Sequence, residues 1–98
     1  MPEALLYEFD GVSADDYHAV NTALGLDVAT GAGDWPDGLR SHTGTLTAEG
    51  RFVLLEVWDS RQSQEAFTAE RLGPALGQVG VPAPARMEWL TVIGSYTG

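Results

Sequence analysis

The heptapeptide FVLLEVW at residues 52–58 carries apolar side chains at both odd and even positions, interrupted only by Glu56. A β-strand with one face in water alternates between apolar and polar residues, so this stretch predicts a strand with both faces covered. Residues 39–47, rich in Thr and flanked by Gly, come before it, and only AEG at residues 48–50 separates the two segments. The pair therefore predicts a β-hairpin.

The length of the hairpin loop decides which residues face each other. A three-residue loop, with Gly50 in a left-handed bulge position, places His42 directly opposite Glu56. A loop that is one residue shorter or longer turns His42 to the other face of the sheet. We favour the three-residue loop, which brings an imidazole and a carboxyl group together.

Two segments before the hairpin have clear periodicities. Apolar side chains at alternate positions predict a strand over residues 5–9. Ser13, followed three residues later by Asp16, is typical of a helix N-terminus, and apolar residues at helical spacing predict a helix over residues 13–24. Residues 25–38 are rich in Gly and Asp, which predicts a long loop.

The segment after the hairpin predicts one more helix and one more strand. Ser60 is a suitable N-cap for a second helix, and Gly73-Pro74 is expected to interrupt that helix because proline lacks the backbone N–H. Residues 87–96 contain closely spaced apolar side chains and predict a last strand. The predicted order of elements is βαββαβ.

This order predicts an α+β, ferredoxin-like fold, in which an antiparallel four-stranded sheet carries both helices on one face. Residues 1–98 then form a single domain. Two helices shield only one face, so the apolar strand at residues 52–58 needs a second sheet on its other face. Another copy of the chain supplies that sheet most simply. We therefore expect a homodimer in which two sheets form an α/β barrel.

The composition excludes several classes of function. The 98 residues include 5 basic side chains, all Arg, and 14 acidic ones, which gives a formal net charge of −9. Without a basic stripe, binding to nucleic acid or to an anionic membrane surface is disfavoured. The chain has no Cys or Lys, and its two His residues show no metal-ligand spacing, so we expect no metal site. The N-terminal residues lack the basic and apolar regions of a signal peptide, which favours a cytoplasmic protein.

The second half of the chain carries a signature formed by EVW at residues 56–58, Ser60, Phe67 and ERLGP at residues 70–74. Within a βαββαβ chain of this length, the signature resembles the antibiotic-biosynthesis-monooxygenase-like branch of the dimeric α/β-barrel superfamily. The resemblance implies a homodimer whose two sheets form a barrel, with a small-molecule cleft between helices and sheet. Members include cofactor-free oxygenases of aromatic polyketides, haem-degrading enzymes and proteins of no known activity.

One position departs from that family pattern. Many members have a His on the second helix, one turn after the Phe, where this chain has Glu70. A carboxylate is a poor substitute for imidazole on haem iron. We therefore expect no cofactor.

His42 and Glu56 are the candidate catalytic residues. An imidazole and a buried carboxyl group can act as general acids or bases, and the favoured hairpin register brings these two together. Alternatively, Glu56 pairs with an Arg such as Arg40 or lies at an exposed sheet edge, and His42 is an ordinary polar strand residue.

Tyr17, Trp35 and Trp58 are the candidate ligand-binding residues, because aromatic ring faces stack on flat apolar ligands. Trp35 lies in the predicted loop, where it would act as a lid or as a dimer contact. Alternatively, Tyr17 and Trp58 belong to the hydrophobic core.

The sequence supports two principal functions. The first is a cofactor-independent, monooxygenase-like enzyme that binds a small aromatic or polyketide-like molecule, deprotonates it with His42 or Glu56, and lets the resulting carbanion reduce O₂. The alternative is a non-catalytic module that binds a small apolar ligand or serves only in dimerisation. Proton transfer of the isomerase type on the same fold is a further possibility.

Overall fold

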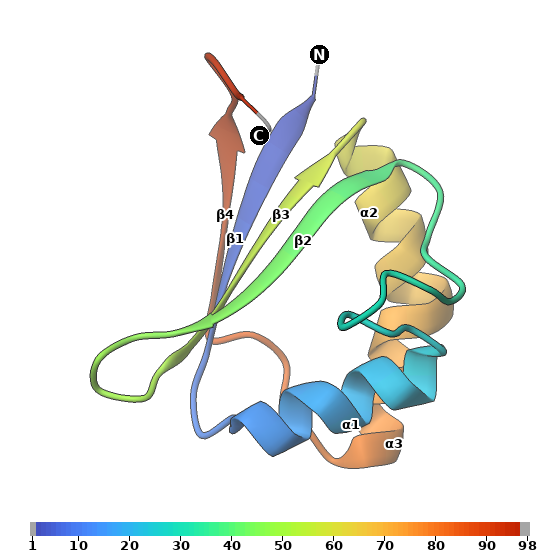
Figure 1. Ribbon diagram of the computed structural model, residues 1–98, viewed down its shortest axis with the longest axis vertical. Coiled ribbons are helices and arrows are strands. Elements are labelled where there is room, and N and C mark those ends of the chain that lie inside the picture. The colour runs from blue at the N-terminus through green and yellow to red at the C-terminus, as the bar shows by residue number, and fades with distance from the viewer. Residues whose placement is uncertain (1, 97–98) are drawn as a thin grey trace.

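The computed structural model describes residues 2–96 as a four-stranded antiparallel sheet with helices on one of its faces (Figure 1). The elements follow the order β1 (Glu3–Phe9), α1 (Ala14–Leu24), β2 (Leu39–Leu46), β3 (Phe52–Trp58), α2 (Arg61–Phe67), η1 (Thr68–Leu72), α3 (Gly73–Val79) and β4 (Arg86–Thr91). The strands lie in the spatial order β2, β3, β1, β4. This is the predicted ferredoxin-like α+β fold.

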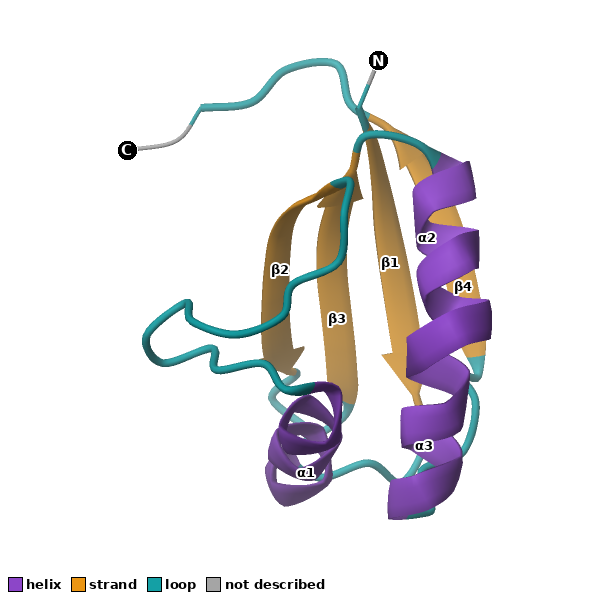
Figure 2. Cartoon of the chain, turned by 90° about the vertical axis from the view of Figure 1, so that its right-hand side faces the viewer, coloured by secondary structure: helices purple, strands orange, loops and turns teal. Residues whose placement is uncertain are grey.

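The hydrophobic core lies between the sheet and the helices, which all cover the same face of the sheet (Figure 2). Alternate strand residues point into this core because side chains on a strand alternate between the two faces. The buried core residues are Leu5, Tyr7, Phe9, Val12, Val20, Phe52, Leu54, Trp58, Phe67, Ala75 and Val81. Glu56 points to the same side as Leu54 and Trp58, so a carboxyl group lies within an otherwise apolar layer.

Within residues 2–96, no helix lies on the opposite face of the sheet (Figure 2). Leu6 on β1 lies directly opposite Leu55 on β3, and Ala4 lies between Val57 on β3 and Leu90 on β4. Leu55 and Leu90 are exposed. We call this face the open face of the sheet. The prediction that β3 is apolar on both sides is confirmed, and the part of the chain that the structure describes covers only one of them.

The hairpin that joins β2 and β3 has the favoured register. His42 lies opposite Glu56, and Gly50 has a φ of 85°, the left-handed conformation that a bulge after a three-residue loop requires. The backbone N–H of Thr47 donates to Arg51 O at 2.9 Å and closes the loop. Because the register is fixed at this turn, His42 and Glu56 share the helix-covered face.

Helix α1 begins where its sequence predicts. Ser13 accepts a hydrogen bond from the backbone N–H of Asp16, and the Asp16 carboxylate accepts one from the N–H of Ser13, which is a capping box. The helix ends at Gly25, whose φ of 75° is favourable for glycine and terminates the helical path.

The interruption expected at Gly73-Pro74 does not break the helix; it takes the form of a π-helical segment, after which α3 begins at Gly73. The chain stays helical from α2 through η1 to α3, and η1 is a π-helical segment. The N–H of Gly73 donates to Thr68 O, five residues back, and Pro74 falls in the first turn of α3. Proline has no N–H to donate to a carbonyl of the preceding turn, so a regular α-helical ladder cannot continue through it. The wider π-helical turn thus accommodates the proline without a break.

The last strand is shorter than predicted. β4 ends at Thr91, and Ile93 and Tyr96 are almost fully exposed beyond it. The sheet register explains the difference, since Thr91 already pairs with Glu3 at the beginning of β1 and no strand residue remains to pair further.

Among residues 2–96, no helix has the length and apolar character needed to cross a membrane.

Candidate functional site

The centre of the candidate site is the carboxyl group of Glu56, which is only 4% exposed. Its Oε1 accepts hydrogen bonds from the Tyr7 hydroxyl at 2.8 Å and from the Trp58 indole N–H at 3.0 Å. Its Oε2 lies 2.8 Å from Nδ1 of His42. Three donors therefore converge on one carboxylate, which compensates for its removal from water.

The alternative in which Glu56 pairs with Arg40 is wrong. Arg40 is exposed, and its Nε donates to Asp59. The strand has a register shift between Leu39 and Ser41, so Arg40 leaves the regular alternation of β2. The partner of Glu56 is the imidazole, which is charged only when protonated.

His42 connects the carboxylate to a hydroxyl group. A carboxylate only accepts hydrogen bonds, so Nδ1 of His42 carries the proton that faces Glu56. In the neutral ring Nε2 is then an acceptor, and it lies 2.7 Å from the hydroxyl oxygen of Tyr17. Tyr17 donates to His42, and His42 donates to Glu56. This arrangement is a base oriented by a carboxylate, with a phenol on its free nitrogen.

Tyr7 and Gln64 support the carboxylate from the other side. The Gln64 amide donates to the Tyr7 hydroxyl at 2.9 Å and to the Thr68 hydroxyl at 2.8 Å. Burial, and next the charge of Glu56, raise the pKa of Tyr7 well above its usual range, so its hydroxyl remains a proton donor to Glu56. These two residues come from β1 and α2 and were not singled out from the sequence, because nothing local marks them as polar contacts.

Tyr17 reaches His42 because β2 has no side chain at Gly44. A Cβ atom at Gly44 would lie 2.8 Å from Cζ of the Tyr17 ring, which is closer than such atoms approach. Burial raises the pKa of Tyr17, so its hydroxyl is protonated at neutral pH. Sequence analysis missed Gly44, although a glycine inside a strand is a recognised sign of close approach.

The two tryptophans that were predicted to bind a ligand, Trp35 and Trp58, have different positions. Trp35 is half-buried, its ring lies edge-on to the His42 ring with centroids 5.5 Å apart, and its N–H donates to Gly31 O and Ala32 O within its own loop. Trp58 has no exposed surface and packs against Phe67. The structure therefore gives Trp58 the core position that was its alternative, without a ring face for a ligand.

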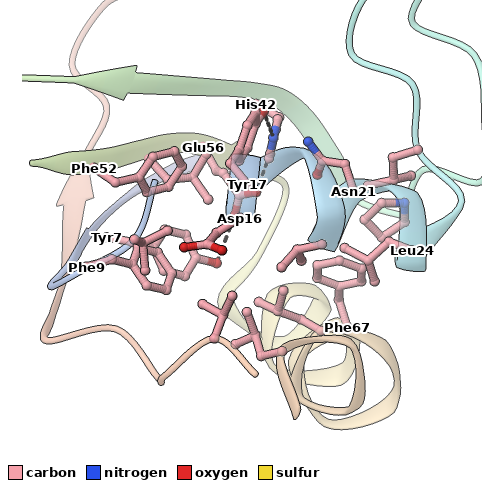
Figure 3. Close-up of a pocket in the computed structure, with 18 of the residues that line it drawn as sticks. Tyr7, Phe9, Asp16, Tyr17, Asn21, Leu24, His42, Phe52, Glu56 and Phe67 are labelled. Carbon is pink, nitrogen blue, oxygen red and sulfur yellow. Dashed lines mark hydrogen bonds and ion pairs between the residues drawn. The ribbon is translucent and has the colours of Figure 1, made fainter. Parts of the chain in front are cut away.

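The space between the helices and the sheet is nearly filled. A cavity of about 50 Å³ remains there, and Figure 3 shows Tyr7, Phe9 and Phe52 of the strands across this pocket from Leu24 and Phe67. An apolar cavity that holds one benzene ring has about 150 Å³. The predicted cleft is therefore present only as a small cavity, because large side chains from both layers occupy most of the space.

A wider groove lies on the outer side of His42. It has about 320 Å³, and its wall includes Trp35, Leu39 and His42, which also line the inner cavity. These three side chains separate the two spaces. His42 thus lies between a small, mostly apolar cavity and a groove large enough for a small organic molecule.

The described residues offer little to a metal ion. Among residues 2–96, no three His, Asp or Glu side chains gather closely enough to hold one. His18, the second histidine, is exposed on α1, and its ring centroid lies 5.4 Å from that of Tyr17.

Several solved structures share this architecture. A Chloroflexus aurantiacus protein assigned to the antibiotic biosynthesis monooxygenases matches with a TM-score of 0.67 and 14% identity, over 99% of this chain and 98% of its own. A Streptomyces coelicolor monooxygenase solved with the ligand nanaomycin D matches with a TM-score of 0.58 and 20% identity, over 99% of this chain and 90% of its own. A cofactor-independent oxygenase of Streptomyces nogalater matches with a TM-score of 0.60 and 11% identity, over 96% of this chain and 93% of its own.

The chain has the fold of the antibiotic biosynthesis monooxygenases. The resemblance inferred from the signature between residues 56 and 74 is confirmed for that fold, and the match extends over nearly the whole chain. No family model and no curated protein matches the sequence. At these identities the monooxygenase fold is shared, while the residues of the site have to be judged from their own geometry.

Proposed function

We propose that this chain is a cofactor-independent, monooxygenase-like enzyme that binds a small aromatic or polyketide-like molecule beside His42. The hydrogen-bonded line from Tyr17 through His42 to Glu56 carries the proposal, because it provides an oriented base at the boundary between a cavity and a groove. The fold adds support, since neighbours with this fold include a cofactor-independent oxygenase and a monooxygenase solved with nanaomycin D.

In this proposal His42 is the base and Glu56 stabilises it. When the imidazole gains a proton at Nε2, it becomes a cation whose Nδ1 already faces the Glu56 carboxylate at 2.8 Å. A carboxylate in a buried position stabilises that cation more strongly than one in water does. The substrate loses a proton from an acidic hydroxyl or C–H group, and the electron-rich anion reacts with O₂ directly, so the protein supplies deprotonation and orientation.

The groove beside Trp35 and His42 is the proposed position of the ligand ring, and Tyr17 faces the inner cavity next to it. Trp35 belongs to the long loop over residues 25–38, so a shift of its ring would join the groove to the inner cavity. Tyr17 would contact the ligand through its hydroxyl. Trp58 has no ligand contact in this proposal, because its ring is fully buried.

We also propose that the chain functions as a homodimer through the open face of the sheet. Leu6, Leu55 and Leu90 form an apolar surface there, and a second sheet of the same kind would cover it. Sedimentation velocity at micromolar concentration measures the association. Leu55→Lys should give monomers, whereas Leu46→Lys, at an exposed leucine near the hairpin loop, should not. A wild-type protein that sediments as a monomer would contradict the dimer.

A non-catalytic ligand-binding module is the second candidate. The observation that favours it is the small volume left between helices and sheet, about 50 Å³, which leaves little room for a substrate near Glu56. In that case Glu56 and His42 would serve to hold β2 against β3, and Tyr17 would fasten α1 to the sheet.

Oxygen uptake with an anthrone or a quinol tests the enzymatic proposal. His42→Gln should lower kcat by about 10² to 10⁴-fold, the usual contribution of a general base. Glu65→Gln is the control, because Glu65 is exposed on α2 and lines neither the cavity nor the groove, and it should leave kcat unchanged. If wild type and His42→Gln consume O₂ equally, His42 is not the base. If neither consumes O₂ and both bind the compound, the second candidate is supported.

A further inference from the structure

The Asn21 side chain has an unsatisfied hydrogen-bond donor inside the protein. Asn21 is 5% exposed, and it lines the inner cavity. Its amide lies close to the Tyr17 hydroxyl, but among residues 2–96 no acceptor lies in good hydrogen-bond geometry with its Nδ2. A buried amide without a partner costs stability, so its presence needs a reason. A ligand atom that accepts a hydrogen bond in the cavity would satisfy it.

Asn21 lies one helical turn after Tyr17, so both side chains leave the same face of α1. The amide is close enough to the Tyr17 hydroxyl to lower the pKa of that phenol, although burial outweighs this effect. Figure 3 shows Asn21, Tyr17 and His42 near one another at the same side of the pocket. One donor and one hydroxyl group therefore face the same small volume.

His42 has no nitrogen free to contact a substrate. Its Nδ1 faces Glu56 at 2.8 Å, and its Nε2 faces the Tyr17 hydroxyl at 2.7 Å. The Tyr17 oxygen donates its own proton to His42, which leaves its lone pairs able to accept another proton. Any proton that reaches His42 in this arrangement passes through Tyr17.

We propose that Asn21 and Tyr17 form a subsite for one ionisable oxygen of the substrate, with Asn21 donating to that oxygen and Tyr17 accepting its proton. This deepens the proposed function and depends on it for the site. Tyr17 becomes the catalytic residue that touches the substrate, and His42 receives the proton through it. Asn21 selects substrates that present an oxygen able to carry a negative charge.

The proton transfer is balanced within the chain. The substrate O–H bond breaks, and its proton bonds to the Tyr17 oxygen while the original Tyr17 proton bonds to Nε2 of His42. The products are a substrate oxyanion held by Asn21 and an imidazolium beside the Glu56 carboxylate. Tyr17 is a neutral phenol before and after the step. No electron is transferred.

The cavity restricts the class of substrate. The acidic groups of its wall are Glu56 and Asp16, and the Asp16 carboxylate already accepts the N–H of Ser13. A volume of about 50 Å³ holds the oxygen and the atoms next to it, whereas the rest of the molecule has to remain in the groove beside Trp35. A neutral phenol or enol with its oxygen at one end fits these conditions. A carboxylate or phosphate ligand does not, because it arrives with its charge already formed next to acidic groups.

Binding of 4-nitrophenol, whose phenolate is coloured, measures the ionisation of the bound oxygen without any oxygenase reaction. The bound phenol should ionise at lower pH than the free one, and a tenfold rise in the ratio of phenolate to phenol corresponds to a change of one pKa unit. We expect a rise of about tenfold in the wild type, within the range that one nearby hydrogen-bond donor and one base produce.

Three variants separate the parts of the subsite. Asn21→Leu should still bind the neutral phenol, lose the rise in ionisation, and raise the melting temperature of the free protein, because an apolar side chain of similar size replaces an unpaired amide. Tyr17→Phe should also lose the rise, since the route to His42 is cut. Glu65→Gln, at an exposed position on α2, is the control and should retain it. The higher melting temperature of Asn21→Leu shows that its loss of ionisation does not come from misfolding.

The proposal is overturned if 4-nitrophenol does not bind at millimolar concentration, or if Asn21→Leu and Tyr17→Phe ionise it as the wild type does. These outcomes differ from a failure of the oxygenase proposal. Ionisation that depends on Asn21, without O₂ uptake on any phenol, supports the subsite and removes the oxygenase function. Oxygen uptake that is equal in wild type and Asn21→Leu supports the oxygenase and removes the subsite.

Discussion

Leu54 and Leu55 are neighbours in β3, yet they have opposite surroundings. Leu54 lies under the helices and is 8% exposed, whereas Leu55 lies on the open face and is 42% exposed. The same comparison applies to the two faces as a whole. The covered face contains a carboxyl group with three donors around it, and the open face is apolar at its centre without cover within the chain. A polar group is thus tolerated in the covered layer because partners satisfy it there.

The largest effect should come from Glu56 on the covered face. Glu56→Ala leaves the Tyr7 hydroxyl, the Trp58 N–H and the His42 N–H without an acceptor, so the free energy of unfolding should fall by about 3–5 kcal/mol in urea denaturation. Glu56→Gln, which keeps the shape and one acceptor oxygen, should lose less. Glu65→Ala on α2 is the exposed control and should stay within about 0.5 kcal/mol. Equal losses for Ala at both positions would contradict the central role of Glu56.

The comparison of the two leucines can be measured directly. Leu54→Ala should lower the free energy of unfolding by about 2–4 kcal/mol, since it removes packed atoms and leaves a cavity. Leu55→Ala removes the same atoms from a half-exposed position and should cost less than about 1 kcal/mol in a monomer. In a dimer through the open face, the cost at Leu55 should grow as protein concentration rises. Similar, concentration-independent costs at both positions would mean that the two faces do not differ as described.

Gly44 tests how closely α1 approaches the covered face. Gly44→Ala places a Cβ 2.8 Å from the Tyr17 ring and should lower the free energy of unfolding by about 1–3 kcal/mol. Gly77→Ala in α3 meets no atom within 4 Å, so it should be neutral or stabilising by about 0.5–1 kcal/mol. If both substitutions stabilise, Tyr17 does not need the space at Gly44.

Alkaline pH should give the smallest change in the free energy of unfolding for each pH unit. The groups that respond are Tyr7 and Tyr17, which both lie on the covered face. Burial raises the pKa of Tyr7 and of Tyr17 in the folded protein, while an unfolded tyrosine ionises near pH 10. The stabilisation is therefore complete below about pH 10 and is lost as pH rises towards the folded-state pKa values. The loss is up to about 1.4 kcal/mol per pH unit for each tyrosine.

Urea denaturation at stepped alkaline pH, together with the absorbance of tyrosinate, measures this dependence. Tyr7→Phe is the matched variant, and its stability should fall less steeply with pH than that of the wild type. An equal slope in both proteins would place the ionisation at other groups.

The hairpin shows how much of the site the sequence could predict. The loop over residues 48–50 with Gly50 fixes the register through local backbone conformation, and that register places His42 opposite Glu56. The hydroxyl group that donates to the other nitrogen of His42 was not predictable in the same way. Tyr17 reaches His42 from a helix 25 positions earlier, through the space left by Gly44.

The second helix shows the opposite case. Gly73-Pro74 indicates an interruption by local rules, yet the packed helix continues through a π-helical turn. Local propensity is weak compared with the burial of Phe67 and Ala75 on either side of that turn. The end of β4 likewise depended on its partner strand, since pairing stops where β1 begins.

The amino-acid order alone determined the succession of strands and helices, the capped start of α1 and the pairing of β2 with β3. Each of these depends on residues close together in the chain, whose conformations are limited by sterics and by local hydrogen bonds. Tertiary packing decided which side of β3 is covered, what surrounds Glu56, and how little space remains beside Asn21. Those features depend on side chains from separate helices and strands. These side chains fill the core and form hydrogen bonds with one another only when the helices pack on the sheet.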